Sequence, residues 1–328
     1  MKKLLKKTLK LILPVVLGGF ILFWVYRDFD FTKAGDVLLH GTNWWWMLFS
    51  LVFGVFAQVF RGWRWRQTLE PLDAFPKKSD CVNAIFISYA ASLVVPRIGE
   101  VSRCGVLAKY DNVSFAKSLG TVVTERLVDT LTILLITGIT VLLQLPIFVT
   151  FLQQTGTKIP SLVHLLTSVW FYIILFCFIG VAILLYYLRK TLFFYERVKG
   201  FVLNIWEGIM SLKGVRNIPL FIFYTLAIWV CYFLHFYFTF YCFAFTAHLG
   251  ILAALVMFVG GTFAVSVPTP NGAGPWHFAI ISMMMLYGVN VTDAGIFALI
   301  VHGIQTFLVV LLGIYGFAAL SFTNRHRG

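Results

Sequence analysis

Long apolar runs, separated by short polar segments, dominate the chain. Continuous runs of the length that crosses a bilayer as a helix, about 20 residues, occur at about 11–27, 44–60, 118–145, 164–188, 219–247 and 294–321. The strands of a membrane barrel would instead alternate apolar and polar residues over about 10 positions. The pattern therefore predicts an all-α polytopic membrane protein with about six full transmembrane helices, in a single domain over residues 1–328.

Two further apolar stretches are interrupted. Pro96 and Gly99 break the stretch at about 80–103, and the sequence VPTPNGAGP lies inside the stretch at about 251–290. Proline removes an amide donor and ends helices, and broken backbone is tolerated at membrane depth where protein or cavity water satisfies it. We therefore predict two re-entrant segments. Two complete crossings for each broken stretch remain the alternative.

The charge distribution predicts the orientation. Of the 328 residues 60% are hydrophobic and only 12% are charged, and the net charge is +13. With the N-terminus in the cytoplasm, 22 of the 26 Lys and Arg residues lie in the N-terminus, the C-terminus and the segments 61–117 and 189–218. Such a bias is typical of cytoplasmic loops beside anionic lipid. It predicts a multi-pass membrane protein with both termini cytoplasmic, and it gives no support to nucleic acid as a partner.

This topology predicts an inverted repeat. The second span, the first broken segment and the third span form one unit; the fifth span, the second broken segment and the sixth span form another in the opposite orientation. Inverted repeats with interrupted helices are a recurring plan of transporters.

Glu125, Arg126 and Asp129 lie inside the third apolar run. Helix spacing puts Glu125 and Asp129 on one side and lets Arg126 pair with Asp129. Ionisable groups at membrane depth usually face a cavity or one another. The cluster is either an ion pair that stabilises the helix or one wall of a polar cavity.

Arg97, Glu100 and Arg103 form a second cluster with three-residue spacing in the first broken segment. Arginine suits phosphate because its planar guanidinium donates two hydrogen bonds at once. These residues predict an anion site, and an ordinary basic cytoplasmic loop is the alternative. A pair between Glu100 and Arg126 would join the two clusters.

The third candidate element is the turn in the second broken segment. Gly272 and Gly274 permit unusual backbone angles, Asn271 lies beside them, and His277 follows. His277 is either a group that titrates near neutral pH or a hydrogen-bonded packing residue. A simple turn between two helices is the alternative for the whole element.

No metal or other cofactor is predicted. His235 and His302 are isolated within their spans and have no ligand partners at metal spacing.

The three elements, in this order, resemble the transmembrane, flippase-like region of lysylphosphatidylglycerol synthases, a family with many stand-alone membrane proteins. The resemblance is carried by PRIGEVSR at 96–103, ERLVD at 125–129 and PTPNGAG at 268–274. It implies an inner-membrane protein with re-entrant segments, associated with moving phospholipids or lipid-linked molecules between leaflets. In relatives an acidic residue usually follows the third motif, whereas this chain has Pro275, Trp276 and His277 there. Synthases also carry a soluble transferase domain, and the chain ends shortly after its last apolar run, so synthase activity is not expected.

We therefore predict a lipid flippase or transporter of lipid-linked anionic substrates rather than an enzyme. The head group would contact a cavity lined by Arg97, Arg103, Glu125, Arg126 and Asp129. Two alternatives remain: an intramembrane enzyme that uses Glu125 and Asp129 on a lipid head group, and an accessory subunit of a separately encoded lipid- or glycan-modifying enzyme. Membrane lipids are the predicted partners.

Overall fold

The computed structural model describes residues 2–96, 98–145 and 214–323, with residues 2–12 described by their backbone alone. This part of the chain is helical and contains no strand, as the sequence predicts. The predicted span at 164–188 lies outside the described residues.

Long apolar helices form the frame of the molecule. Four of them are long and apolar enough to cross a membrane. They are α3 (Trp44–Leu69), α6 (Phe115–Leu143), α11 (Ile218–Tyr237) with its 3₁₀ continuation to Cys242, and α14 (Val291–Thr323). The first predicted span is part of α1 (Lys2–Tyr26), whose apolar section Leu13–Tyr26 is shorter. A short helix, α2 (Phe31–Asp36), and a π-helical turn (Val37–Gly41) connect α1 to α3.

The first broken segment forms a helical hairpin. It consists of α4 (Lys78–Val94) and α5 (Ile98–Tyr110), with the break at Val95 and Pro96. Gly99 lets the two helices approach closely, because a Cβ atom at this position would lie 2.0 Å from the carbonyl oxygen of Ser88. The Gly99 amide also donates to Ser92 Oγ at 3.2 Å. The predicted break is confirmed; its re-entry into a membrane stays a prediction.

The second broken segment is also a hairpin, formed by α12 (Ile251–Ala264) and α13 (Pro275–Leu286). Its turn contains a short 3₁₀ helix, η6 (Pro270–Gly272), and three residues with positive φ: Asn271, Gly272 and Gly274. Glycine adopts such angles without strain, so two of these residues suit the turn.

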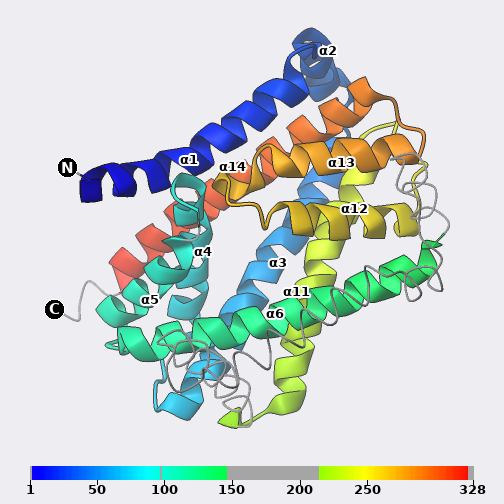
Figure 1. The fold of residues 1–328 in the computed structure, drawn as a ribbon. Helices are drawn as coiled ribbons and strands as arrows, with labels where there is room; N and C mark the ends of the chain where they lie inside the picture. The colour runs from blue at the N-terminus through cyan, green and yellow to red at the C-terminus, as the bar shows by residue number, and fades with distance from the viewer. Residues whose placement is uncertain (1, 97, 146–213, 324–328) are drawn as a thin grey trace, which may run out of the picture.

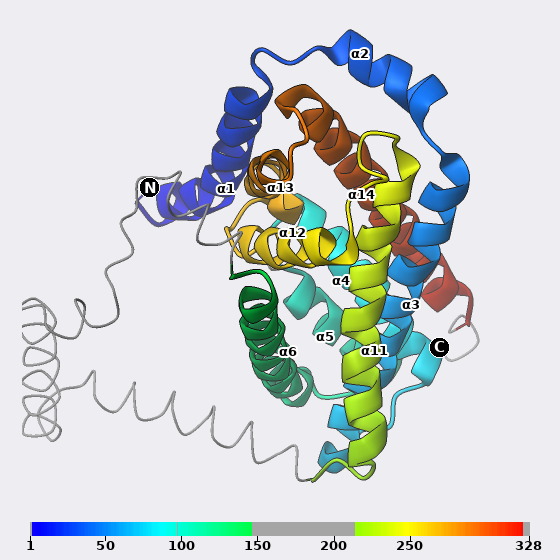
Figure 2. The ribbon, with the colours of Figure 1, turned by 90° about the vertical axis from the view of Figure 1, so that its right-hand side faces the viewer.

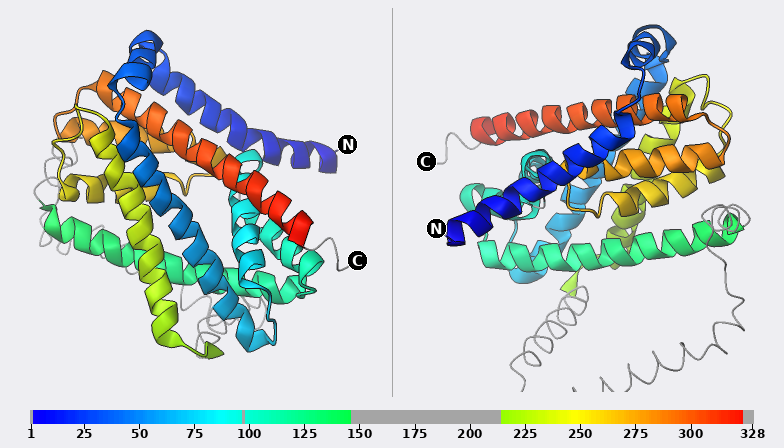
Figure 3. Two further views of the ribbon diagram at one scale, coloured as in Figure 1. Left: turned by 180° about the vertical axis from the view of Figure 1, so that it is seen from behind. Right: turned by 45° about the horizontal axis from the view of Figure 1, so that its top comes forward.

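The packing of the helices repeats between the two halves. One unit is α3, α4, α5 and α6, and the other is α11, α12, α13 and α14. The helices α3 and α11 pack against each other, α4 packs on α14, and α12 packs on α6. If each helix is replaced by its counterpart in the other unit (α3 by α11, α4 by α12 and α6 by α14, and the reverse), the same three pairs result. Figure 1 shows that α6 and α14 run in opposite directions, and Figure 3 shows the same for α3 and α11. The packing thus has the inverted repeat that the hydropathy predicts.

The two units enclose different interiors. Around α12, α13 and the first half of α14 lies a large apolar core that includes Phe240, Met257, Ile280, Met284 and Phe297. The corresponding region of the first unit, around α4, α5 and the first half of α6, has a smaller apolar cluster next to buried charged side chains. Figure 2 shows α1 and α13 side by side, with α6 and α5 below them.

Candidate functional site

The C-terminal half of α3 presents two arginines to α6. Arg61 and Arg64 are three residues apart and so share a helix face, and both are buried. The predicted second span ends at about residue 60, but the helix α3 continues to Leu69. Both arginine side chains lie in this continuation and are buried by protein.

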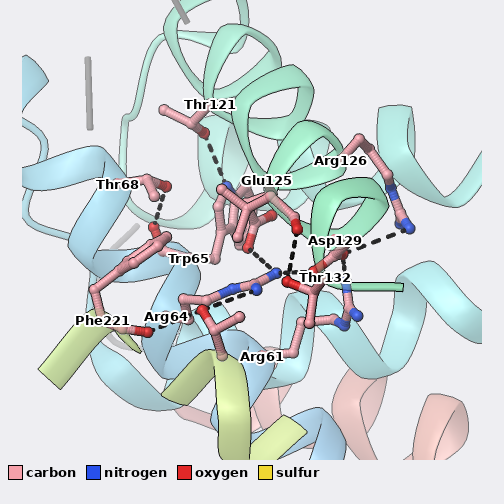
Figure 4. Close-up of polar contacts among 12 residues, drawn as sticks. Arg61, Arg64, Trp65, Thr68, Thr121, Glu125, Arg126, Asp129, Thr132 and Phe221 are labelled. Atoms are coloured by element: carbon pink, nitrogen blue, oxygen red, sulfur yellow. Dashed lines mark hydrogen bonds and ion pairs between the residues drawn. The ribbon is translucent and has the colours of Figure 1, made fainter. Parts of the chain in front are cut away.

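Both arginines bind the same carboxylate. Arg61 Nη1 lies 2.7 Å from Asp129 Oδ2, and Arg64 Nη2 lies 2.7 Å from Asp129 Oδ1 (Figure 4). Each carboxylate oxygen therefore has its own guanidinium, an arrangement that gives strong charge-assisted hydrogen bonds. Arg64 Nη1 also donates to Thr225 Oγ1 on α11 at 3.3 Å. The pair thus connects both units of the repeat.

Glu125, one turn before Asp129, connects α6 to the first hairpin. Arg103 Nη1 on α5 lies 2.6 Å from Glu125 Oε2, and Arg64 Nη2 lies 3.6 Å from Glu125 Oε1. The guanidinium of Arg103 also stacks 4.5 Å from the ring centroid of Trp65, whose Nε1 donates to Thr121 Oγ1 at 2.9 Å. Aromatic faces attract cations, so Trp65 adds to the stabilisation of Arg103 by Glu125.

One edge of the cluster is open. Arg126 Nε lies 2.7 Å from Glu100 Oε1, and their side chains are 46% and 35% exposed. Arg126 Nη1 reaches Asp129 Oδ2 only at 4.0 Å. The sequence-predicted pair of Glu100 and Arg126 is therefore present, while the predicted pair of Arg126 and Asp129 is at the limit of contact. Arg97 lies outside the described residues.

The connected ion pairs carry an excess of positive charge. The network contains four arginines and three carboxylates: Arg61, Arg64, Arg103 and Arg126 with Glu100, Glu125 and Asp129. Its buried part has three arginines and two carboxylates. The Nε atoms of the three buried arginines have no hydrogen-bond partner among the described residues. Both oxygens of Glu125 also lack a hydrogen-bond partner there and meet arginine only as ion pairs. Removing charge from water is costly, and the buried part of the network has one arginine more than it has carboxylates.

A second polar group lies at the turn of the second hairpin. Asn271 Nδ2 donates to Thr306 Oγ1 at 2.7 Å, and His302 Nε2 donates to the Asn271 carbonyl oxygen at 3.1 Å. The rings of His302 and His277 are 4.5 Å apart. The sequence interpretation of His302 as isolated is therefore wrong, because α13 and α14 pack together and bring the histidines into contact. Gly272 and Gly274 form the turn itself.

The two polar groups are separate. Among the described residues, no hydrogen bond or ion pair joins Asn271 or His277 to the arginine cluster. The turn that carries Asn271 nevertheless packs on α4, so the two hairpins meet in the interior of the molecule. No group of three or more metal-binding side chains occurs in the described part of the chain.

The sequence contained a signal for the arginines that hydropathy overlooked. Two arginines three apart at the end of an apolar run match two carboxylates four apart in another run, since both spacings give a single helix face. Complementary pairs of this kind point to contact between the two helices.

Comparison with known proteins gives a consistent result. The family model described as the lysylphosphatidylglycerol synthase TM region matches residues 11–313, nearly the whole chain. UPF0104 membrane protein MJ1078 of Methanocaldococcus jannaschii is 25% identical over 225 residues, which are 68% of this chain and 90% of that protein. No solved structure matches.

Proposed function

The chain belongs to the lysylphosphatidylglycerol synthase TM region family, and we propose that it moves an anionic phospholipid or lipid-linked anion between the leaflets of the bacterial plasma membrane. In this proposal both termini are cytoplasmic. The arginine cluster then lies towards the cytoplasmic side, because α3 ends there and α6 begins there.

The observation that carries the proposal is the buried network with one more arginine than carboxylate. A phosphate diester head group carries one negative charge and accepts hydrogen bonds from arginine forks. Such a group balances the network without replacing either buried carboxylate. The site therefore fits an anionic lipid better than a zwitterionic one.

The exposed pair of Arg126 and Glu100 is the entry to this site. Because both side chains are partly exposed, a head group can compete with the Glu100 carboxylate for Arg126 at low cost. Arg103 and Arg64 lie behind them, bound to Glu125. An anion that enters along α5 and α6 thus meets successive guanidinium groups while its acyl chains stay in the lipid.

The inverted repeat supports transport. Transporters of this plan bind substrate where interrupted helices of the two repeats meet, and one unit moves against the other. Here the turn of the second hairpin packs on α4 of the first. A rearrangement of these two hairpins would open the arginine cluster to either side in turn.

The carboxylates are less suited to catalysis than to binding. General acid–base work needs a group that exchanges protons near the operating pH. Asp129 already binds two arginines and Glu125 already binds Arg103, so neither carboxylate is free for a substrate. This geometry supports transport over the intramembrane enzyme. The accessory-subunit hypothesis is tested separately by copurification with a transferase.

Leaflet exchange in reconstituted vesicles tests the proposal. The purified chain is incorporated into phosphatidylcholine vesicles that contain a trace of fluorescent phosphatidylglycerol or of fluorescent phosphatidylcholine. A quencher that cannot cross the membrane then reports how much of the fluorescent lipid lies in the outer leaflet. We expect faster exchange of the anionic lipid than in protein-free vesicles and little effect on the zwitterionic lipid. Equal rates for the two lipids, or no acceleration with any anionic lipid, would contradict the proposal.

A further inference from the structure

The histidines of the second hairpin form a pair that the arginine cluster does not explain. His277 is in the first turn of α13 and is 3% exposed, and His302 is partly buried in the middle of α14. Their rings lie 4.5 Å apart at an angle of 56°. Both rings border the turn whose η6 residues pack on α4, so their charge state affects the place where the two hairpins meet.

Hydrogen bonding determines which nitrogen of each neutral ring carries the hydrogen. The Asn271 carbonyl only accepts, so His302 Nε2, 3.1 Å away, carries a hydrogen and Nδ1 has the free lone pair. The Gly274 amide only donates, so His277 Nδ1, 3.4 Å away, must have the lone pair. In both rings Nδ1 is thus the basic atom.

The two rings respond differently to an added proton. His302 Nδ1 lies 3.5 Å from Thr306 Oγ1, which accepts a hydrogen bond, so a proton on this nitrogen keeps every contact of the turn. A proton on His277 Nδ1 would remove the acceptor of the Gly274 amide at a position with φ of +93°. Two charged rings in contact repel each other, so the pair accommodates one proton, on His302.

A cavity lies near His277, on the side that faces outward in the predicted topology. It has a volume of about 410 Å³ and lies between the end of α1, α13 and the start of α14, with Arg27 and Asp28 in its lining. Tyr26 also lines this cavity, and its ring contacts the His277 ring edge-on with centroids 5.7 Å apart. Tyr26 therefore contacts both the cavity and one member of the histidine pair.

The surroundings of the pair hold few other ionisable groups. Tyr26 faces it from α1, and it donates to the Gly295 carbonyl. The helix α12, which packs on α13, has no ionisable side chain. On α4 and α3, which pack on α14, Tyr89 is bound to Tyr232, and Arg61 and Arg64 are bound to Asp129. The buried Asp80 of α4 accepts a hydrogen bond from Ser79 through one of its oxygens. Among the described residues no carboxylate or cation contacts either ring.

We propose that His302 and His277 form a proton-binding site that couples lipid movement to one proton. A proton from external water bonds to His302 Nδ1, and the ring becomes a cation that keeps its bond to the Asn271 carbonyl. The hairpin turn then carries a positive charge and attracts the anionic head group away from the arginine cluster. Release of the proton to water returns the ring to its neutral form. This inference rests on the proposed transport function.

Nitrogen NMR of the full chain tests the site without any transport measurement. The protein is labelled with ¹⁵N-histidine, placed in nanodiscs and acidified from about pH 8 to about pH 5, the range in which histidine titrates. His302→Gln and His277→Gln assign the signals. We expect His302 Nδ1 to gain a proton while His277 stays neutral. Simultaneous protonation of both rings, or a neutral His302 throughout, would overturn the proposal.

Transport measurements then test the coupling. In vesicles with a trapped pH indicator, wild-type protein should bring in protons when anionic lipid exchanges between leaflets. The rate of lipid exchange should change by up to about tenfold per pH unit, as expected for one bound proton. His302→Gln should lose both the proton entry and the pH dependence of exchange. Thr306→Val, which removes the acceptor for the added proton, should weaken both effects.

His248→Gln is the matched control, because His248 is exposed and distant in sequence from the pair. It should behave as wild type. If wild-type protein exchanges no anionic lipid, the proposed function fails while the NMR result still decides the proton site. If exchange occurs with unchanged proton entry in His302→Gln, the transport function stands and the coupling is refuted.

Discussion

Arg103 on the first hairpin and Glu125 on α6 form a buried ion pair, with 2.6 Å between Nη1 and Oε2. Both side chains are almost fully enclosed, at 2% and 0% exposed. The pair therefore adds a charged contact to the apolar packing between the hairpin and α6, in which Cys104 and Leu107 cluster with Val122.

Removing Arg103 should destabilise the protein strongly. Arg103→Ala leaves Glu125 buried with only the 3.6 Å contact to Arg64, and a buried charge without its partner costs about 3–5 kcal/mol. Thermal unfolding in detergent measures the loss. The control is Arg27→Ala, which breaks an exposed pair with Asp28 and should cost no more than about 1 kcal/mol. Equal losses for the two variants would contradict the assigned role of burial.

Arg126→Ala should abolish exchange of anionic lipid with little effect on folding. Its side chain is 46% exposed, so its pair with Glu100 contributes little to stability, while it is the first guanidinium that an entering head group meets. The measurement is leaflet exchange at matched protein content. Arg27→Ala serves as the control, since Arg27 forms an exposed pair with Asp28 outside the cluster. Unchanged exchange in Arg126→Ala would exclude the proposed entry.

Glu100→Gln should raise the affinity of the protein for anionic lipid. The change removes the carboxylate that competes for Arg126 and raises the excess charge of the network by one. We expect anionic lipid to bind up to about tenfold more tightly, equivalent to about 1.4 kcal/mol, and to be released more slowly. Titration of the purified protein with short-chain phosphatidylglycerol measures the affinity. Weaker binding in this variant would show that Glu100 contacts the head group favourably.

Gly99→Ala should separate the two helices of the first hairpin. A Cβ atom there would lie 2.0 Å from the Ser88 carbonyl oxygen, a backbone atom that cannot move aside alone. We expect a large loss of thermal stability and faster proteolysis near residue 96. Gly105→Ala on the same helix has nothing within 4 Å of the new atom and should be neutral or slightly stabilising. Similar behaviour of the two variants would contradict the observed packing.

Single-cysteine labelling tests whether the hairpins are re-entrant. In a cysteine-free background, Lys78→Cys and Lys109→Cys should react with an impermeant reagent from the cytoplasmic side, because they flank the first hairpin. His248→Cys and Asn290→Cys flank the second hairpin and should react from the external side. If the two ends of either hairpin react from opposite sides, that segment crosses the membrane fully.

Hydropathy and helix breakers predicted most of the frame. The helix breaks at Pro96 and around Gly272 follow from local backbone chemistry, and the described spans follow from apolar length. The C-terminal part of α3 was not predicted, because a hydropathy window ends at Arg61 although the helix does not. Only the carboxylates of a helix distant in the sequence explain why arginines remain inside it.

The candidate site was predicted only in part from the sequence. Glu100 and Arg126 were matched from their charges, and the structure brings them together. The contact of His277 with His302 depends on how α13 packs on α14, which no local pattern determines. Arg61 and Arg64 provide half of the network's positive charge, and they were missed because they resemble an ordinary interfacial end of a span.

The unequal interiors of the two units have a mechanical consequence. A close-packed apolar core loses many dispersion contacts when any helix shifts, so it has one preferred arrangement and resists deformation. An interior held by ion pairs deforms more readily, because a guanidinium can exchange one oxygen for another and water or a phosphate can replace a lost partner. The unit around Phe297 is then the stiff half of the molecule and the unit around Glu125 the compliant half. If the proposed transport takes place, we expect the unit around Glu125 to move while the unit around Phe297 keeps its arrangement.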